Sequence, residues 1–308
     1  MKIALVETRN VYNDEMPENL DNISVDELEK IRKANVDHHI NLIKGAVSEG
    51  VNIICFGELF AYPYFALEKT ELWLKAAEEL NNSKTIEELL AVSAEHNVVI
   101  VAPMYEKKDG KYYNTTVVLE SGKLIGSYRK THIPQGTNEQ GEFIEKYYFS
   151  ANDDESINEG RDSVILGDTP FYPVFDTSYG KIAVMTCYDR HFGDKIVPIL
   201  KNKGAELIFV PSVTFGEVAE RMWTLESPTD AMRNRVFMAV LNRKGIEKPW
   251  GQEFFGNSYV VNPDGKRVKF LENNLSKDLL IAEVDLNRIN EESKSGWNLQ
   301  RDLSARLF

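Results

Sequence analysis

Short apolar runs alternate with longer amphipathic segments along most of the chain. Val25 to Glu49 predicts a helix, because its apolar residues recur at helical spacing with Arg32 as the one interruption. Val98 to Pro103 is apolar throughout, as in a strand covered on both faces. Further strands are predicted at Lys2–Val6, Asn52–Phe56, Tyr112–Glu120, Leu124–Tyr128, Glu206–Pro211, Val236–Asn242, Ser258–Asn262 and Leu279–Val284, a hairpin at Asp176–Thr186, and further helices near Glu68–Leu80, Thr85–His96, Asp194–Lys203 and Pro228–Arg235.

Helices placed between strands predict a layered α/β fold, and the hairpins indicate mixed rather than purely parallel sheets. No internal repeat or low-complexity linker divides the chain, so we expect residues 1–308 to form a single domain. One stretch departs from the pattern. Residues 151–164 are rich in acidic side chains and lack apolar periodicity, which predicts a solvated surface insertion.

Composition narrows the class of partner. The formal net charge is −12 and no stretch is rich in lysine or arginine, which argues against a nucleic-acid or acidic membrane surface. No window approaches the length of a membrane span, and the N-terminus lacks the apolar core of a signal peptide. With only two cysteines, we expect a cytoplasmic protein without disulfides.

Three strands are each followed by a chemically active side chain. Glu58 follows the run that ends at Phe56, Lys130 follows the run that ends at Tyr128, and Cys187 follows an apolar run that ends at Met185. Pockets in layered α/β folds form where strands end, so a carboxylate, an ammonium and a thiol can meet there.

The chemistry of these three groups is complementary. A carboxylate can accept the thiol proton, and an ammonium can stabilise a tetrahedral oxyanion. Each residue also has a plainer interpretation: Glu58 as a helix cap, Lys130 as a solvated side chain, and Cys187 as a core cysteine, which we also expect for Cys55. From the residues alone, the nucleophile and core interpretations of Cys187 are about equally supported.

Three motifs resemble the signatures of the nitrilase superfamily of carbon–nitrogen hydrolases, in that family's order. They are Gly57–Phe60, Tyr128–Pro134 and Thr186–Phe192, and Gly256–Gly265 is similar to the family's late hairpin. The resemblance implies a four-layer α-β-β-α sandwich with two mixed sheets, and a homodimer or higher homo-oligomer.

The same resemblance implies the site residues. Glu58 corresponds to the catalytic base, Lys130 to the lysine and Cys187 to the nucleophile, with the Tyr188 backbone N–H as an oxyanion donor. Phe143–Phe149 is similar to a segment of the carbamoyl-cleaving branch, which makes Glu145 a second glutamate that orients the lysine or the substrate; a surface glutamate is the alternative. No cofactor is implied, and the five histidines lack metal-ligand spacing.

The substrate must be inferred from the residues around the nucleophile. Arg190 is placed to bind a substrate carboxylate, and His191 and Asn242 to add hydrogen bonds. The alternative is that Arg190 pairs with Asp189 or another acid and only supports the loop. Cys187–His191 resembles the β-ureidopropionase and N-carbamoyl-amino-acid amidohydrolase branch more than the putrescine branch, whose cationic substrate an arginine here would repel.

We therefore expect hydrolysis of an N-carbamoyl amino acid, such as N-carbamoyl-β-alanine, through a Cys187 thioester. The alternatives are an ω-amidase, an aliphatic amidase or nitrilase, and a catalytically silent binding protein. Two features depart from the branch: Gly193-Asp194 stands where Pro-Glu is usual, and the acidic segment replaces a short connection. The aromatic stretch Tyr62–Phe65 either lines the pocket or packs in the core.

Overall fold

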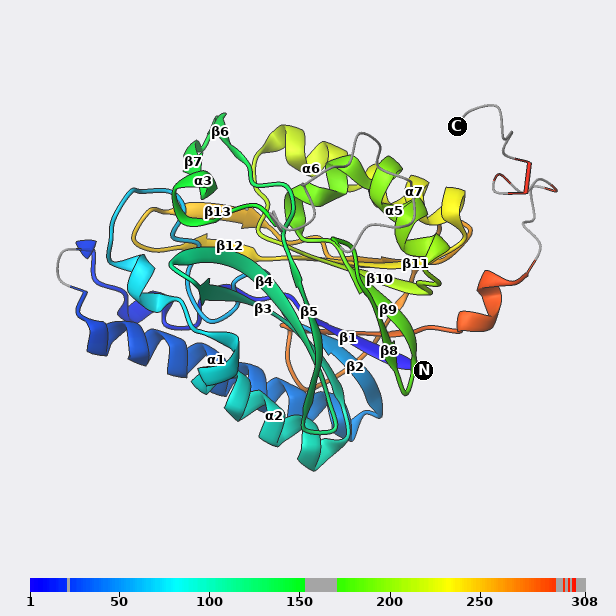
Figure 1. Cartoon of the computed structure of the whole chain (residues 1–308), viewed down its shortest axis with the longest axis horizontal. Helices are drawn as coiled ribbons and strands as arrows, with labels where there is room; N and C mark the ends of the chain where they lie inside the picture. Colours follow the sequence, from blue (N-terminus) through cyan, green and yellow to red (C-terminus); the bar gives the residue numbers. More distant parts are fainter. Residues whose placement is uncertain (21–22, 153–170, 292–295, 297–298, 300, 303–308) are drawn as a thin grey trace.

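The computed structural model describes residues 1–20, 23–152, 171–291, 296, 299 and 301–302 (Figure 1). Most of the predicted acidic insertion, residues 153–164, lies outside the described residues. No helix among the described residues is long and apolar enough to cross a membrane.

Two large mixed sheets form the centre of the molecule. The first has the order β16-β17-β1-β2-β3-β4-β5, and the second has the order β15-β14-β11-β10-β9-β8. The strands of the first are β1 (Lys2–Val6), β2 (Val51–Cys55), β3 (Val99–Lys108), β4 (Lys111–Glu120), β5 (Lys123–Arg129), β16 (Phe270–Leu271) and β17 (Leu279–Glu283). Those of the second are β8 (Val174–Thr177), β9 (Gly180–Val184), β10 (Leu207–Ser212), β11 (Phe237–Asn242), β14 (Tyr259–Val261) and β15 (Arg267–Val268).

Helices cover the outer face of each sheet (Figure 1). The first sheet is covered by α1 (Val25–Ser48) and α2 (Lys84–His96), and the second by α5 (Gly193–Asn202), α6 (Glu217–Trp223) and α7 (Glu226–Asn234). The predicted four-layer α-β-β-α sandwich is therefore confirmed. Arg32, which interrupts the apolar stripe of α1, is buried against Glu29 of its own helix and Glu88 of α2.

The first sheet contributes side chains to two hydrophobic cores, one on each of its faces. Ile3 and Leu5 of β1 face the second sheet, whereas Ala4 and Val6 face the helices, because successive strand side chains point to opposite faces. Cys55 lies in the core between the sheets with no exposed area, in agreement with its predicted packing role.

Two small hairpins lie beside the sandwich. One pairs β6 (Gln135–Asn138) with β7 (Gly141–Ile144) and continues into the one-turn helix α3 (Glu145–Tyr148). The other pairs β12 (Lys244–Glu247) with β13 (Gln252–Phe255).

The helix predicted near Glu68–Leu80 is wrong. The structure has two short 3₁₀ turns there, Trp73–Ala76 and Leu80–Asn82. The Tyr148 hydroxyl donates to the Glu68 carbonyl at 2.6 Å and accepts from the Thr70 N–H at 3.1 Å. The Glu68 carbonyl is a group that a helix starting there would need as an acceptor in its own ladder.

Candidate active site

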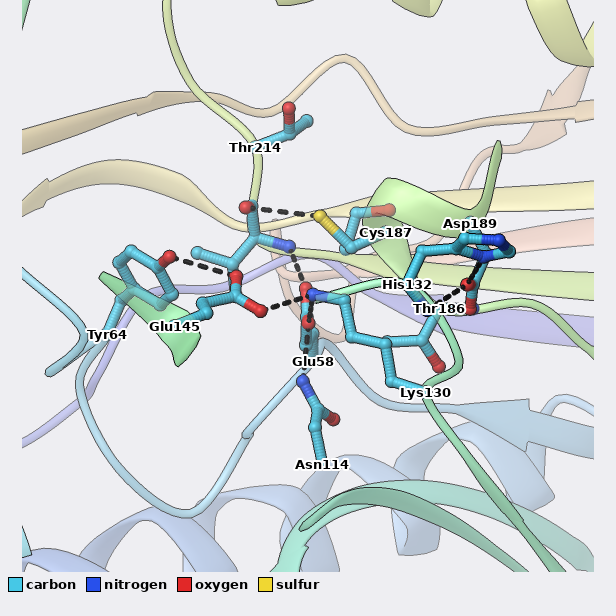
Figure 2. A network of polar contacts seen from close by, with 12 residues as sticks. Glu58, Tyr64, Asn114, Lys130, His132, Glu145, Thr186, Cys187, Asp189 and Thr214 are labelled. Atoms are coloured by element: carbon cyan, nitrogen blue, oxygen red, sulfur yellow. Dashed lines mark hydrogen bonds and ion pairs between the residues drawn. The ribbon is translucent and has the colours of Figure 1, made fainter. Parts of the chain in front are cut away.

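The three strand-end residues come together between the sheets (Figure 2). Glu58 follows β2 and Lys130 directly follows β5 of the first sheet, whereas Cys187 follows β9 of the second. β3 runs parallel to β2 and antiparallel to β4, which in turn is antiparallel to β5, so β2 and β5 end at the same edge. Because the two sheets face each other, the thiol of Cys187 lies close to the carboxylate of Glu58 and the ammonium of Lys130.

Lys130 lies at the centre of the cluster. Its Nζ donates to Glu58 Oε1 at 2.8 Å and to Glu145 Oε2 at 2.7 Å, and all three side chains are buried. The Tyr64 hydroxyl donates to the other Glu145 oxygen at 3.0 Å. Glu145 is therefore part of the buried cluster rather than a surface residue.

Glu58 is held at both carboxylate oxygens. Asn114 Nδ2 donates to Oε1 at 2.6 Å, and the backbone N–H of Val213 donates to Oε2 at 2.6 Å. Cys187 Sγ lies 3.4 Å from the carbonyl oxygen of the same Val213. The backbone of Val213 thus contacts both the carboxylate and the thiol.

Burial controls the charge state of this cluster. Burial raises the pKa of Glu145 to about 7, with Lys130 opposing the shift and Glu58 reinforcing it. For Lys130, burial lowers the pKa, but the charges of Glu145 and Glu58 outweigh it and hold the pKa well above its usual value. The lysine therefore stays charged.

The thiol rests in its protonated form. Burial raises the pKa of Cys187 to about 12, and the Glu58 charge raises it further, whereas Lys130 and Arg190 oppose the shift. A protonated thiol is a weak nucleophile and needs a base close by to accept its proton.

Cys187 also has unusual backbone geometry. Its φ of 48° is left-handed, a conformation that costs a non-glycine residue roughly 1–3 kcal/mol. It opens a 3₁₀ turn, Cys187–Phe192, that directly precedes α5. Such a sharp turn after a strand lifts the thiol out of the sheet toward a pocket, and the surrounding contacts must hold it there.

The thiol opens into a pocket of about 230 Å³. Glu145 and Tyr64 form part of its wall beside Cys187, so the aromatic stretch contributes Tyr64 to the pocket while Tyr62 and Phe65 pack in the core. Glu139 lies on the turn between β6 and β7, and it also lines the pocket. The volume suits a small molecule rather than a polymer.

Arg190 and His191 form another part of the pocket wall. Both contact Glu226, with Arg190 Nε 3.2 Å from Oε2 and His191 Nδ1 2.6 Å from Oε1. Arg190 also donates to the Cys187 carbonyl at 3.1 Å and to Thr214 Oγ1 at 3.2 Å. The acid that pairs with Arg190 is therefore Glu226, not Asp189.

The remaining predicted substrate residues differ in position. Tyr188 lines the pocket and is partly exposed. Asn242 does not line it: its side chain accepts from the Thr214 N–H at 2.9 Å and donates to the Thr214 carbonyl at 3.1 Å. The predicted hydrogen bond from Asn242 to substrate is therefore wrong, because the oxygen and the NH₂ group of its amide already bind the backbone of Thr214.

Residues 30–292 match the family model of carbon-nitrogen hydrolases. The chain belongs to the carbon–nitrogen hydrolase family. It is 32% identical to a β-ureidopropionase of Arabidopsis thaliana over 84% of this chain, although the match spans only 62% of that relative. It is 30% identical to an N-carbamoylputrescine amidase of Oryza sativa subsp. japonica over 90% of this chain and 89% of the relative.

The fold agrees with the sequence match. A crystal structure of a carbon-nitrogen hydrolase from Helicobacter pylori G27 aligns with a TM-score of 0.76 at 26% identity, over 98% of this chain and 95% of that one. The family match and the amidohydrolase relatives confirm the predicted family and the prediction that the protein is an enzyme.

Several residues of the site carried no clear signal in the sequence. Asn114 lies mid-strand in β4, and Glu226 opens α7, so neither follows a recognisable motif. Asp189 lies inside the cysteine motif, but its position beside the nucleophile does not reveal its partners. Among the described residues, no group of histidine, cysteine and acidic side chains is arranged to hold a metal ion.

Proposed function

We propose that this carbon–nitrogen hydrolase cleaves the carbamoyl group of a small N-carbamoyl amino acid through a thioester on Cys187. Glu58 accepts the thiol proton as sulfur attacks the carbamoyl carbon. The tetrahedral intermediate expels ammonia or the amine, which takes up the proton from Glu58. Water then hydrolyses the thioester and returns a proton to the thiolate, and the carbamic acid released decomposes to CO₂ and the nitrogen compound that did not leave in the first step, the amine or ammonia.

Lys130 supplies the positive charge for this reaction. An ammonium has three donors, and two of them bind Glu58 and Glu145, so one N–H is left for the oxyanion. The backbone N–H of Tyr188, next to the nucleophile, is the second proposed donor. Glu145 orients the lysine, and its raised pKa allows it to share a proton near neutral pH.

One observation carries the proposal. The thiol of Cys187 and the carboxyl of Glu145 share the wall of one small pocket with Arg190 and His191. The sulfur marks the position of the reacting bond, and the guanidinium of Arg190 lines the same pocket, where it can bind a substrate carboxylate. This arrangement supports a substrate with a carbamoyl group at one end and a carboxylate at the other.

A carbamoylated amine is the second candidate, and the ion pair of Arg190 favours it. Glu226 offsets the charge that was expected to repel a cation, and Glu139 adds a carboxylate to the pocket. The similarity to an N-carbamoylputrescine amidase supports the same alternative.

Ammonia release from a substrate panel tests these proposals. The panel contains N-carbamoyl-β-alanine, N-carbamoylputrescine, a dicarboxylic acid monoamide and an aliphatic nitrile. We expect the highest kcat/KM with N-carbamoyl-β-alanine. A higher value with N-carbamoylputrescine selects the second candidate. Mass spectrometry of the trapped Cys187 adduct distinguishes a carbamoyl group from an acyl group on the sulfur. A preference for the monoamide or the nitrile would reject both carbamoyl substrates.

A further inference from the structure

Arg243 and Glu247 form an ion pair in the protein interior, behind the residues that line the pocket. Arg243 Nη1 lies 2.6 Å from Glu247 Oε1, and their side chains are 3% and 0% exposed. Neither residue lines the pocket around Cys187. Arg243 directly follows β11 of the second sheet, and Glu247 ends β12.

The guanidinium of Arg243 binds the backbone that carries Glu58. It donates to the carbonyl of Glu58 at 2.9 Å, to that of Leu59 at 3.2 Å and to that of Tyr62 at 3.1 Å. Leu59 has a φ of 53°, a left-handed conformation that is unfavourable for leucine. Such strain persists only where surrounding contacts hold it, and Arg243 makes those contacts.

Glu247 binds the far end of the same loop. Its Oε2 accepts from the Tyr64 N–H at 2.9 Å, and its Oε1 accepts from the Asn10 N–H at 2.6 Å. Tyr64 in turn donates from its hydroxyl to Glu145. The ion pair therefore fixes both ends of a loop that carries one carboxylate of the site and orients the other.

Asn242, which precedes Arg243, holds the opposite side of Glu58. It binds the backbone of Thr214, next to the Val213 N–H that donates to Glu58 Oε2. Two adjacent residues thus act on the same carboxylate: Arg243 binds the main chain at and after Glu58, and Asn242 binds the segment whose N–H donates to Glu58 Oε2.

A gain in folding stability does not account well for the buried Arg243–Glu247 pair. A buried ion pair often contributes no more to folding than apolar side chains of the same volume, because desolvation offsets the attraction. Its advantage lies in fixed geometry, since a planar guanidinium can bind several carbonyls at once in one orientation.

We propose that the buried Arg243–Glu247 pair is a positioning device that sets Glu58 and Tyr64 for catalysis; this rests on the proposed role of Glu58 as the base. A displacement of about 1 Å in a catalytic group can cost on the order of 100-fold in rate. The pair acts on the chemical step without touching substrate.

Arg243→Lys tests the proposal, since lysine keeps the charge opposite Glu247 but loses the planar fork. We expect kcat on the wild type's best substrate to fall about tenfold or more, with KM changed less than about threefold. Alkylation of Cys187 by iodoacetamide should slow to a similar degree. The alkylation needs no substrate, so it remains informative even if the proposed carbamoyl specificity fails.

Arg32→Lys is the matched control. Arg32 is also buried and makes four hydrogen bonds, to Glu29, Glu88 and Thr85, but it lies on α1 and does not line the pocket. Both variants should lower the unfolding temperature, and only Arg243→Lys should lower kcat. Equal kcat in the two variants, or a rise in KM alone for Arg243→Lys, overturns the proposal.

Glu247→Gln provides a second variant if Arg243→Lys does not fold. It preserves volume but turns an acceptor into a donor opposite the Tyr64 N–H, so kcat should fall here too. If the pair works as one unit, the double variant loses no more than about threefold beyond the worse single variant. Losses that multiply would mean that the two residues act separately, contrary to the proposal.

Discussion

Asp189 and His132 are joined twice. Asp189 Oδ1 accepts from the His132 backbone N–H at 3.0 Å and lies 2.7 Å from the ring Nδ1. Its Oδ2 accepts from the Thr186 N–H at 3.0 Å and from the Tyr128 hydroxyl at 2.5 Å. Tyr128 and His132 flank Lys130, and Thr186 precedes Cys187, so one buried carboxylate links the two backbone segments that carry the lysine and the thiol.

Asp189→Asn should impair catalysis more than stability. An amide has one acceptor oxygen, so its NH₂ must face at least one of the donors that the carboxylate now accepts. We expect kcat to fall about 10- to 100-fold from loss of alignment, measured by ammonia release. Asp278→Asn is the control, because Asp278 also binds several donors, Thr8, His38 and Lys244, remote from the pocket. Equal losses of activity in both variants would contradict the alignment role.

The thiol of Cys187 should react slowly at neutral pH. Because its pKa is raised to about 12, the thiolate fraction should grow about tenfold for each pH unit between pH 7 and 10. In Glu58→Gln, which removes the base that assists the thiol, labelling with methyl methanethiosulfonate followed by peptide mass should show this slope, whereas a free thiol with an ordinary pKa of about 8.5 should level off about one pH unit above that value. A plateau for Cys187 below pH 9 would disagree with the burial of the thiol.

Glu226→Gln should shift substrate preference toward carboxylates. Without Glu226, the guanidinium of Arg190 loses its counter-charge and faces the pocket as a net cation. The ratio of kcat/KM for N-carbamoyl-β-alanine to that for N-carbamoylputrescine should rise about fivefold or more, consistent with one charge interaction in a partly buried site. Glu220→Gln, on the exposed part of α6, should leave the ratio unchanged. A fall in the ratio would show that Arg190 does not act on the substrate charge.

Asp230 should make stability depend on pH. Burial raises its pKa to about 7 from an ordinary value of 3.8, so the folded chain holds a proton that the unfolded chain releases at lower pH. Its contribution to stability is therefore full below pH 3.8 and is lost as pH rises to about 7. Asp230→Asn keeps a neutral side chain, so it should raise the unfolding temperature at pH 8 but hardly at pH 4.

The exposed Asp176 supplies the control for that experiment. Asp176→Asn should change the unfolding temperature by the same small amount at both pH values. A stabilisation by Asp230→Asn that is equal at pH 4 and pH 8 would mean that the carboxyl of Asp230 is not the titrating group.

The same carboxyl explains why Gly193 carries no side chain. A Cβ at that position would lie 2.1 Å from Asp230 Oδ2, so the proline expected there from the family resemblance would not fit.

Local patterns predicted most of the strands and the long helix α1. Glu58, Lys130 and Cys187 were predictable because each stands where an apolar run stops, within a recognisable motif. The segment at residues 68–80 was not, because Tyr148 engages its backbone from a distant part of the chain. The partner of Asn242 could not be predicted for a similar reason, since Thr214 lies on another segment of the chain.

The sequence by itself determined the family, the layered fold and the identity of the thiol, lysine and carboxylates, because these follow from periodicity and short motifs. Only the tertiary structure decided their partners: Asn114 and Val213 for Glu58, Glu226 for Arg190, and Arg243 for the loop behind Glu58. These contacts join residues from 36 to 185 positions apart. They form only when packing of the two sheets buries the groups and leaves each polar atom to find a partner within reach.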